Sequence, residues 1–226
     1  MSPDNKDKKD VAGSFASLTF VGEITASVTH ELSNVVGTIE QVSGLIEDLT
    51  YTPEIQDAGI AERLMDVVER VARQTERGTT LIRRLNRFAH LADNEKVECD
   101  LAQVLENVAA LSERLVNLKK VNLVTSGLAD SLPLICNPLM VAQSVFGMVK
   151  RVLSTADGSE PLRIELVGVS RGALVTVSAR VGTDVADDMM QAPENLPLEA
   201  FGGSLAHRTE NGRFILELTV PNSAGE

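Results

Sequence analysis

The hydrophobic positions of residues 12–49 predict one long amphipathic helix. Apolar or small side chains recur there at spacings of three and four residues, the heptad pattern of helices that pack along a narrow seam. The seam positions are Leu18, Val21, Thr25, Val28, Leu32, Val35, Ile39, Val42, Ile46 and Leu49. Tyr51-Thr52-Pro53, followed by Gly59, is expected to end this helix and form a connection. The polar segment 1–11 before it is expected to be a short disordered tail.

A second amphipathic pattern extends from about residue 60 to residue 92. Its apolar set comprises Leu64, Val67, Val68, Val71, Leu81, Ile82, Leu85 and Phe88. Two long helices with a short connection should pack antiparallel, which gives a helical hairpin over residues 12–95. One hairpin cannot bury both sides of such stripes. We therefore predict a homodimer in which two hairpins form a four-helix bundle.

The pattern changes at about residue 97 to short strands and two helices. Strands are expected at 97–99, 121–125, 134–136, 162–169, 173–181, 203–209 and 213–220. Asp100 with Gln103 has the pattern of a helix cap, and Asn137-Pro138 suits the first two positions of a helix through Leu153. The sum is a mixed sheet covered by two helices over residues 96–226. The fold class is therefore α+β, a helical hairpin followed by an α/β sandwich.

Composition narrows the classes of function. The net charge of −11 argues against general nucleic-acid binding. No apolar run approaches the length of a membrane span, and the charged N-terminus is unlike a signal peptide. The two cysteines, Cys99 and Cys136, fit a reducing compartment better than a disulfide framework. We expect a cytoplasmic protein without a membrane partner.

His30 is the candidate functional residue of the first helix. If Val28 is a d position and Leu32 an a position, His30 falls at f, the point farthest from the seam. Glu31 follows directly, and Asn34 lies one helical turn later on the same face. A lone exposed histidine on a helix is usually an ordinary surface residue, but this surrounding sequence favours a function.

The same segment resembles the H-box of two-component sensor histidine kinases, whose pattern is His-Glu-Leu-x-Asn/Thr-Pro. The chain reads His30-Glu31-Leu32-Ser33-Asn34-Val35, preceded by the familiar Gly22-Glu23-Ile24. Val35 stands where the family usually has proline, so a straighter helix is expected. The resemblance implies that His30 accepts a phosphoryl group, that paired hairpins form the dimer, and that response-regulator receiver domains are the partners. It also implies that Glu31 accepts a proton from the ring or orients it, and that Asn34 positions a water.

The second helix is basic within an acidic chain. Seven arginines stand against four acidic residues, which gives +3 and leaves −14 for the rest. Antiparallel register places His30 opposite a residue near Leu81, with Arg77, Arg83 and Arg84 within about a turn. Helical ion pairs on a solvated face explain most of these arginines. The functional hypothesis is that one or two of Arg77, Arg83 and Arg84 help a phosphoryl group or an acidic partner to dock.

Residues 96–222 are similar in element order to the ATP-binding domain of histidine kinases, but the nucleotide motifs are missing. Gly147 and Arg151 replace the two asparagines that hold magnesium and phosphates in that family, and neither has an oxygen-donor side chain. The strand ending at Gly182 has no aspartate for the adenine, with Asp184 a poor substitute. The loop from there to Gly202 is short and carries Asp187, Asp188, Glu194 and Glu199. We expect no ATP binding and no metal site, with magnesium supplied by the receiver.

These observations favour a histidine phosphotransferase that exchanges a phosphoryl group between His30 and receiver aspartates. Neutral imidazole is a competent nucleophile near neutral pH. Three alternatives stay open: a non-catalytic dimeric scaffold for a receiver or kinase, a kinase with an atypical ATP site, and a protein with phosphatase activity alone. No function is assigned to His90 or His207.

Overall fold

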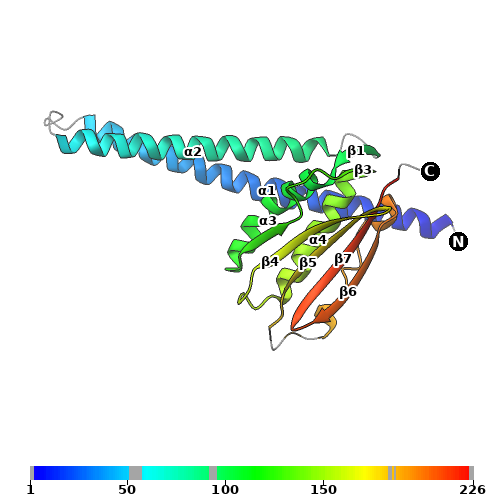
Figure 1. Ribbon diagram of the computed structural model, residues 1–226. Coiled ribbons are helices and arrows are strands. Elements are labelled where there is room, and N and C mark those ends of the chain that lie inside the picture. The colour runs from blue at the N-terminus through cyan, green and yellow to red at the C-terminus, as the bar shows by residue number, and fades with distance from the viewer. Residues whose placement is uncertain (1–2, 51–57, 92–95, 183–184, 186, 224–226) are drawn as a thin grey trace. The chain divides into compact units, whose positions relative to one another are not determined.

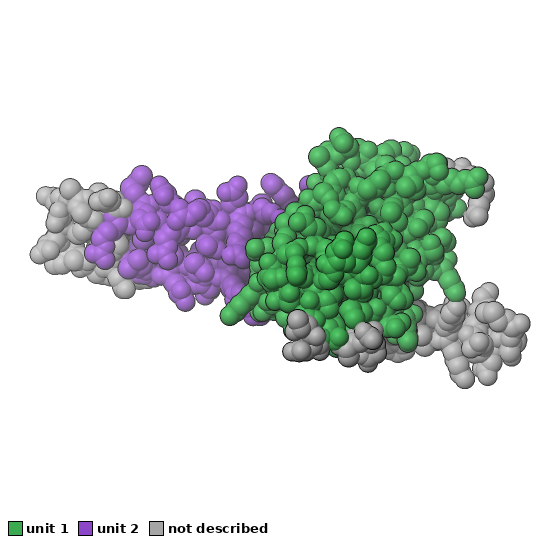
Figure 2. Space-filling model, turned by 60° about the horizontal axis from the view of Figure 1, so that its bottom comes forward, with its two compact units in different colours: residues 1–21, 88–226 green, residues 22–87 purple. Residues whose placement is uncertain are grey.

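The computed structural model describes residues 3–50, 58–91, 96–182, 185 and 187–223. The chain forms two compact units (Figures 1 and 2). Residues 22–87, purple and labelled unit 2 in Figure 2, are called the first unit here. Residues 1–21 together with 88–226, green and labelled unit 1 there, are called the second unit. The predicted connection at Tyr51-Thr52-Pro53 lies outside the described residues.

The helices of the first unit bury a narrow apolar stripe. Residues 22–87 contain most of α1 (Pro3–Thr50) and of α2 (Ala58–His90), which lie antiparallel (Figure 1). The buried stripe comprises Ile24, Val28, Val35 and Val42 from α1 with Val67 and Leu81 from α2. Of the predicted seam, Val28, Val35 and Val42 are buried and Leu32 and Ile39 half-buried, whereas the prediction is wrong at Leu18 and Thr25, which are exposed. Ile24 takes the buried position because its side chain removes more apolar surface from water.

The start of α1 also differs from the prediction. The helix begins at Pro3 rather than near Ala12, so most of the segment 1–11, predicted to be a disordered tail, is helical. Proline suits the first turn of a helix, where its missing N–H needs no partner. No further proline or glycine interrupts the chain before Gly13, so the helix continues without a break.

The second unit is built on a five-stranded mixed sheet with the strand order β2-β4-β5-β7-β6. Its strands are β2 (Leu123–Ser126), β4 (Leu162–Val169), β5 (Gly172–Arg180), β6 (Ser204–Glu210) and β7 (Arg213–Pro221). β2 and β4 are parallel, and every other pair is antiparallel. A separate antiparallel ribbon joins β1 (Val97–Asp100) to β3 (Pro133–Cys136). The predicted α+β class and each predicted strand are confirmed to within two residues at their ends.

The two helices that pack on this sheet begin at the predicted caps. Asp100 accepts a hydrogen bond from the Ala102 N–H at the start of α3 (Leu101–Leu118). Asn137 accepts one from the Met140 N–H at the start of α4 (Pro138–Thr155), with Pro138 in the first turn. Side-chain oxygens at these positions satisfy backbone donors that the helix itself leaves open. Along β4, buried Leu162, Ile164 and Leu166 alternate with other residues, as a strand with one covered face requires.

An aromatic cluster joins residues of α1 and α2 to α4 within the second unit. The Phe20 ring lies 5.3 Å from Phe88 and 5.2 Å from Phe146 of α4, centroid to centroid. These three residues all belong to the second unit. Residues near the start of α1 and the end of α2 therefore share its hydrophobic core.

Candidate functional site

His30 lies exposed on α1, as the heptad position predicts. Its Nδ1 lies 3.3 Å from the amide nitrogen of Asn34, one helical turn away. With this orientation Nδ1 accepts the hydrogen bond and Nε2 carries the ring proton. If the Asn34 amide turns over, its oxygen accepts from Nδ1–H and leaves the lone pair on Nε2. The Asn34 amide can therefore pair with either neutral tautomer of the His30 ring.

Glu31 is held by α2 rather than by the histidine. Its carboxylate lies 3.7 Å from a guanidinium nitrogen of Arg77. The Glu31 side chain is only 22% exposed, whereas that of Arg77 is 60% exposed. Among the described residues no hydrogen bond joins Glu31 to His30, which agrees with adjacent helix positions pointing in different directions. The pair places one exposed cation on α2 at the level of the histidine.

A buried glycine sets the helix register beside this site. A β-carbon at Gly78 would lie 3.1 Å from Cγ1 of Val35, so α2 passes close to α1 at this point. In an antiparallel pair, the contact of Val35 with Gly78 places His30 level with Arg83, and the Glu31–Arg77 pair places it level with Gly78. The α2 residues level with His30 therefore lie between Gly78 and Arg83. The prediction of a residue near Leu81 opposite His30 agrees with this register. Arg83 is exposed and Arg84 half-buried, and their docking roles stay predictions.

In the second unit, Leu196 packs on Gly147, the residue at which the family resemblance implies an asparagine that holds phosphates. Gly147 lies on α4, and a β-carbon there would lie 2.6 Å from Cδ2 of Leu196. Leu196 belongs to the segment between β5 and β6, which includes the short helices η1 (Asp187–Met190) and η2 (Leu198–Phe201). An asparagine at residue 147 would therefore require Leu196 to move. Asp184, considered as an adenine ligand, lies outside the described residues.

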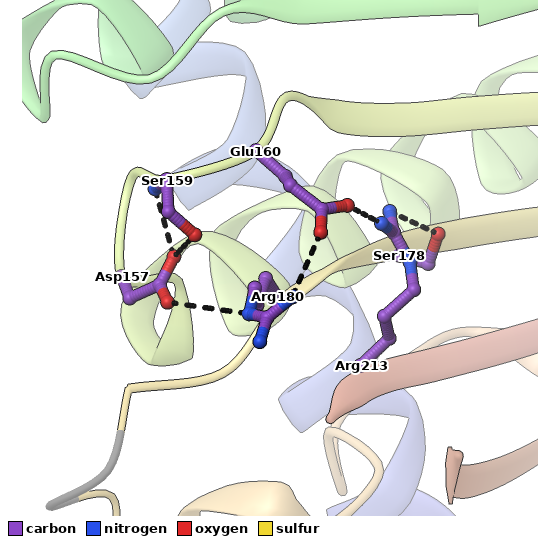
Figure 3. Close-up of polar contacts among 6 residues, drawn as sticks. All are labelled: Asp157, Ser159, Glu160, Ser178, Arg180 and Arg213. Carbon is purple, nitrogen blue, oxygen red and sulfur yellow. Dashed lines mark hydrogen bonds and ion pairs between the residues drawn. The ribbon is translucent and has the colours of Figure 1, made fainter. Parts of the chain in front are cut away.

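Ion pairs occupy the end of β5, where a nucleotide-binding aspartate is expected in the family (Figure 3). Arg180 lies 3.1 Å from the Glu160 carboxylate and 3.9 Å from that of Asp157. Arg213 from β7 also donates to Glu160 and approaches the Ser178 hydroxyl at 3.4 Å. The two carboxylates and two guanidinium groups thus satisfy one another. We call Asp157, Glu160, Arg180 and Arg213 the β5-end cluster.

The β5-end cluster predicts a specific pH dependence of stability. The hydrogen bond from Arg180 holds the pKa of Glu160 below its ordinary value, and burial opposes this effect. A lowered pKa in the folded state stabilises the protein above the unfolded value of about 4.3, and this contribution disappears as the pH falls through the folded pKa. Glu160→Gln should therefore lower the free energy of unfolding at neutral pH, and the difference from wild type should shrink below about pH 4.

Urea unfolding at neutral and acidic pH measures this effect. Glu194→Gln is the matched control, because Glu194 is exposed and lies outside the cluster, and it should follow wild type at both pH values. A constant difference between Glu160→Gln and wild type across the pH range would show that the ionised carboxylate does not contribute.

The described residues contain neither a metal-binding cluster nor a membrane-spanning helix. No three His, Cys, Asp or Glu side chains among them gather in a way that could hold a metal ion. None of the described helices combines the length and apolar content that crossing a membrane needs. The expectations about metal and nucleotide stay predictions.

The sequence predicts His30, Glu31, Asn34 and Arg77 as site residues but not the pairing of Glu31 with Arg77. That pairing depends on helix register, and the buried Gly78 beside Val35 is a local sign of it. Leu196 packs on Gly147 although the two residues are far apart in sequence, and no sequence pattern predicts this contact.

Comparisons with known proteins give structural likenesses only. No family model matches the chain, and no curated protein matches it. The structure is similar to the Acinetobacter baumannii histidine kinase AdeS, with 16% identity, 86% of this chain and 98% of that chain covered, and a TM-score of 0.47. It is also similar to a bacterial phosphotransferase, with 11% identity, coverage of 89% and 96%, and a TM-score of 0.48.

A third likeness is to the histidine kinase ThkA, determined in complex with the response regulator protein TrrA. The identity is 16%, the coverage is 91% of this chain and 63% of that chain, and the TM-score is 0.45. At such identities and TM-scores none of these likenesses decides an activity. The chemistry of the site therefore rests on the residues described above.

Proposed function

We propose that the protein is a histidine phosphotransferase of a two-component relay, which exchanges a phosphoryl group between His30 and receiver aspartates without binding ATP. The observation that carries this proposal is the exposed His30 ring with its Nδ1 beside the Asn34 amide. A partner can reach this imidazole without disturbing the buried stripe of the hairpin. The H-box sequence around it gives the exposed ring its phosphoacceptor role.

The reaction needs little from this chain beyond a positioned nucleophile. A lone pair on the imidazole attacks the phosphorus of a receiver aspartyl phosphate, a P–N bond forms, and the aspartate carboxylate leaves with the electrons of the P–O bond. Phosphoryl transfer depends mainly on in-line positioning and charge neutralisation. The receiver supplies magnesium, Asn34 contacts Nδ1 of the ring, and Arg77 places a positive charge near the transferred group. Glu31 positions Arg77 and is a candidate acceptor for the ring proton.

A homodimer accounts for the apolar side chains that the hairpin leaves exposed. Met65, Val68 and Ile82 on α2 are 64%, 55% and 50% exposed, and Val36 on α1 is 52% exposed. Val68 and Ile82 are two heptads apart, and Met65 lies three residues before Val68, so they form a second stripe beside the buried one. A second hairpin packed on this stripe would complete a four-helix bundle.

Two packing features of the second unit support the proposed absence of ATP binding. Leu196 packs on Gly147, and the arginines of the β5-end cluster pair with carboxylates of the same chain. Gly147 has no oxygen-donor side chain, and the carboxylates of the β5-end cluster are already paired with arginines, so neither arrangement favours a metal–triphosphate complex. A fold without its nucleotide can still serve as part of the docking surface for a receiver.

Two labelling reactions test the proposal. Purified protein is incubated with magnesium and γ-labelled ATP at millimolar concentration, and separately with labelled phosphorylated receiver domains from the same genome. We expect acid-labile label only in the second reaction. Label from ATP would make the protein a kinase. A receiver that binds without exchanging label would support the scaffold hypothesis, and loss of receiver phosphate that survives removal of His30 would indicate phosphatase activity alone.

Arg77 offers a more selective test. Arg77→Ala should change the free energy of unfolding by less than about 1 kcal/mol, because exposed ion pairs contribute little. We expect the rate of transfer to His30 to fall about tenfold, which corresponds to about 1.4 kcal/mol of transition-state stabilisation. Rapid-quench measurement of labelled protein gives the rate.

Arg73→Ala is the matched control for this prediction. Arg73 lies on the same helix, pairs with Glu69 at 3.4 Å and is 61% exposed, nearly the same as Arg77. It should transfer at the wild-type rate. Equal rates for the two variants would remove Arg77 from the site.

A further inference from the structure

The two cysteines meet across the β1–β3 ribbon. Cys99 Sγ lies 3.4 Å from Cys136 Sγ, and 37 residues separate them in sequence. Cys99 pairs with Leu134 and Cys136 with Val97, so the two thiols are diagonal neighbours on one face of the ribbon. The sulfur atoms need to approach by about 1.4 Å to reach the length of a disulfide bond, about 2.05 Å.

The surroundings of the two thiols give them different reactivity. Cys99 is partly exposed, whereas Cys136 is buried. The hydrogen bond with Cys136 lowers the pKa of Cys99, against the opposing effects of burial and of Asp100. The same hydrogen bond, together with burial, raises the pKa of Cys136. Cys99 is therefore the more reactive of the two thiols, because it is partly exposed and its pKa is lowered.

Both thiols also lie beside the start of a helix. Cys99 directly precedes Asp100, the N-cap of α3, and Cys136 directly precedes Asn137, the N-cap of α4. The N-terminus of a helix carries partial positive charge, which favours a thiolate nearby. Each cysteine is thus joined through one residue to the start of a helix in the core of the second unit.

We propose that Cys99 and Cys136 form a redox modification site, in which a hydroperoxide converts the neighbouring thiols into a reversible disulfide. The Cys99 thiolate attacks the terminal peroxide oxygen, the O–O bond breaks, and the alkoxide or hydroxide leaves and takes up a proton. Cys99 is then a sulfenic acid. The Cys136 sulfur attacks the Cys99 sulfur, the S–O bond breaks, and the leaving hydroxide takes the Cys136 proton to become water. Two thiols and one hydrogen peroxide thus give one disulfide and two waters.

The bond would tie together the starts of α3 and α4. β3 is already held on its other side, since Ile135 N–H donates to the Asn222 side chain at 3.1 Å and Ser223 N–H donates to the Ile135 carbonyl at 2.9 Å. Cross-linking residues far apart in sequence restricts the unfolded chain. The oxidised protein should therefore melt at a higher temperature than the reduced protein, and a reductant should reverse the shift.

The experiment uses the full chain, hydrogen peroxide and mass spectrometry. After peroxide treatment, the wild-type monomer should lose two hydrogen atoms, resist alkylation when denatured, and yield one linked peptide pair containing Cys99 and Cys136. Cys136→Ser should instead accumulate a sulfenic acid on Cys99, which a cyclic diketone traps. In Cys99→Ser the remaining thiol is buried and should react at least about tenfold more slowly.

Three outcomes would overturn the proposal. In the first, the wild-type thiols stay fully alkylatable under conditions that oxidise free glutathione. In the second, the disulfide joins two chains instead of forming within one. In the third, Cys136 is oxidised in preference to Cys99. Circular dichroism checks that each variant is folded. The linked peptide is measured on the wild-type protein alone, so the test for the disulfide does not depend on the stability of a variant. The test needs no receiver or nucleotide and stands apart from the proposed phosphotransfer.

Discussion

Replacing His30 with alanine is expected to abolish acid-labile labelling of the protein by phosphorylated receiver domains. Alanine has no lone pair to attack the aspartyl phosphate, and no other exposed histidine of the described hairpin has an amide one turn away in the H-box pattern. Because His30 is exposed and outside the buried stripe, the free energy of unfolding should change by less than about 0.5 kcal/mol. Autoradiography after exchange with a labelled receiver, together with urea unfolding, measures both quantities.

His90→Ala is the control for this result. His90 also lies exposed on a helix, near the end of α2, and its loss should leave labelling intact. Full labelling of His30→Ala would place the phosphoacceptor elsewhere. A scaffold would instead keep its biological effect without His30, so complementation of a deletion strain by His30→Ala separates that alternative from phosphotransfer.

Gly127→Ala is expected to destabilise the second unit strongly. Gly127 has a φ of 72°, and a β-carbon there would lie 2.0 Å from the backbone oxygen of Leu166 in the neighbouring strand β4. The left-handed backbone costs an alanine about 1–2 kcal/mol, and relieving the clash adds about 1–3 kcal/mol. The free energy of unfolding should therefore fall by about 2–5 kcal/mol, as urea unfolding of the purified protein would show.

Gly212→Ala separates these two contributions. Gly212 has the same φ of 72°, in the turn between β6 and β7, but nothing lies within 4 Å of the position of its β-carbon. Only the backbone cost of about 1–2 kcal/mol is expected there. Equal losses in the two variants would show that β2 and β4 adjust to the extra methyl group without cost.

The strands and turns of the second unit were predictable because their signals are local. Asn211 and Gly212 both adopt positive φ, 51° and 72°, and join β6 to β7. Asn-Gly between two alternating apolar runs is the sequence that such a two-residue turn favours. Asp100 and Asn137 similarly predict where α3 and α4 begin, because a side-chain oxygen at an N-cap accepts a hydrogen bond from a backbone N–H only two or three residues away.

The hairpin was less predictable because its periodicity allows two neighbouring stripes. Val28, Val35 and Val42 fit the predicted seam, but Ile24 rather than Thr25 is buried with them. On α2 the predicted set mixed buried Val67 and Leu81 with exposed Val68 and Ile82. A heptad pattern identifies an apolar face, but packing against the neighbouring helix decides which positions of that face are buried within one chain.

The contacts of the candidate site residues differ in how far the sequence predicts them. His30 and Asn34 share a helix, so their contact follows from a spacing of four residues. The Glu31–Arg77 pair and the contact between the two cysteines depend on tertiary register. No local pattern encodes that register.

The contact of Leu196 with Gly147 links the substitutions that these two positions can accept. The β-carbon of any larger residue at 147 would lie 2.6 Å from Cδ2 of Leu196 unless that side chain moves aside. The two positions, 49 residues apart (196 − 147), therefore constrain each other. An enlarged residue 147 should be found together with a smaller residue 196, and a lineage that keeps leucine at 196 should keep glycine at 147.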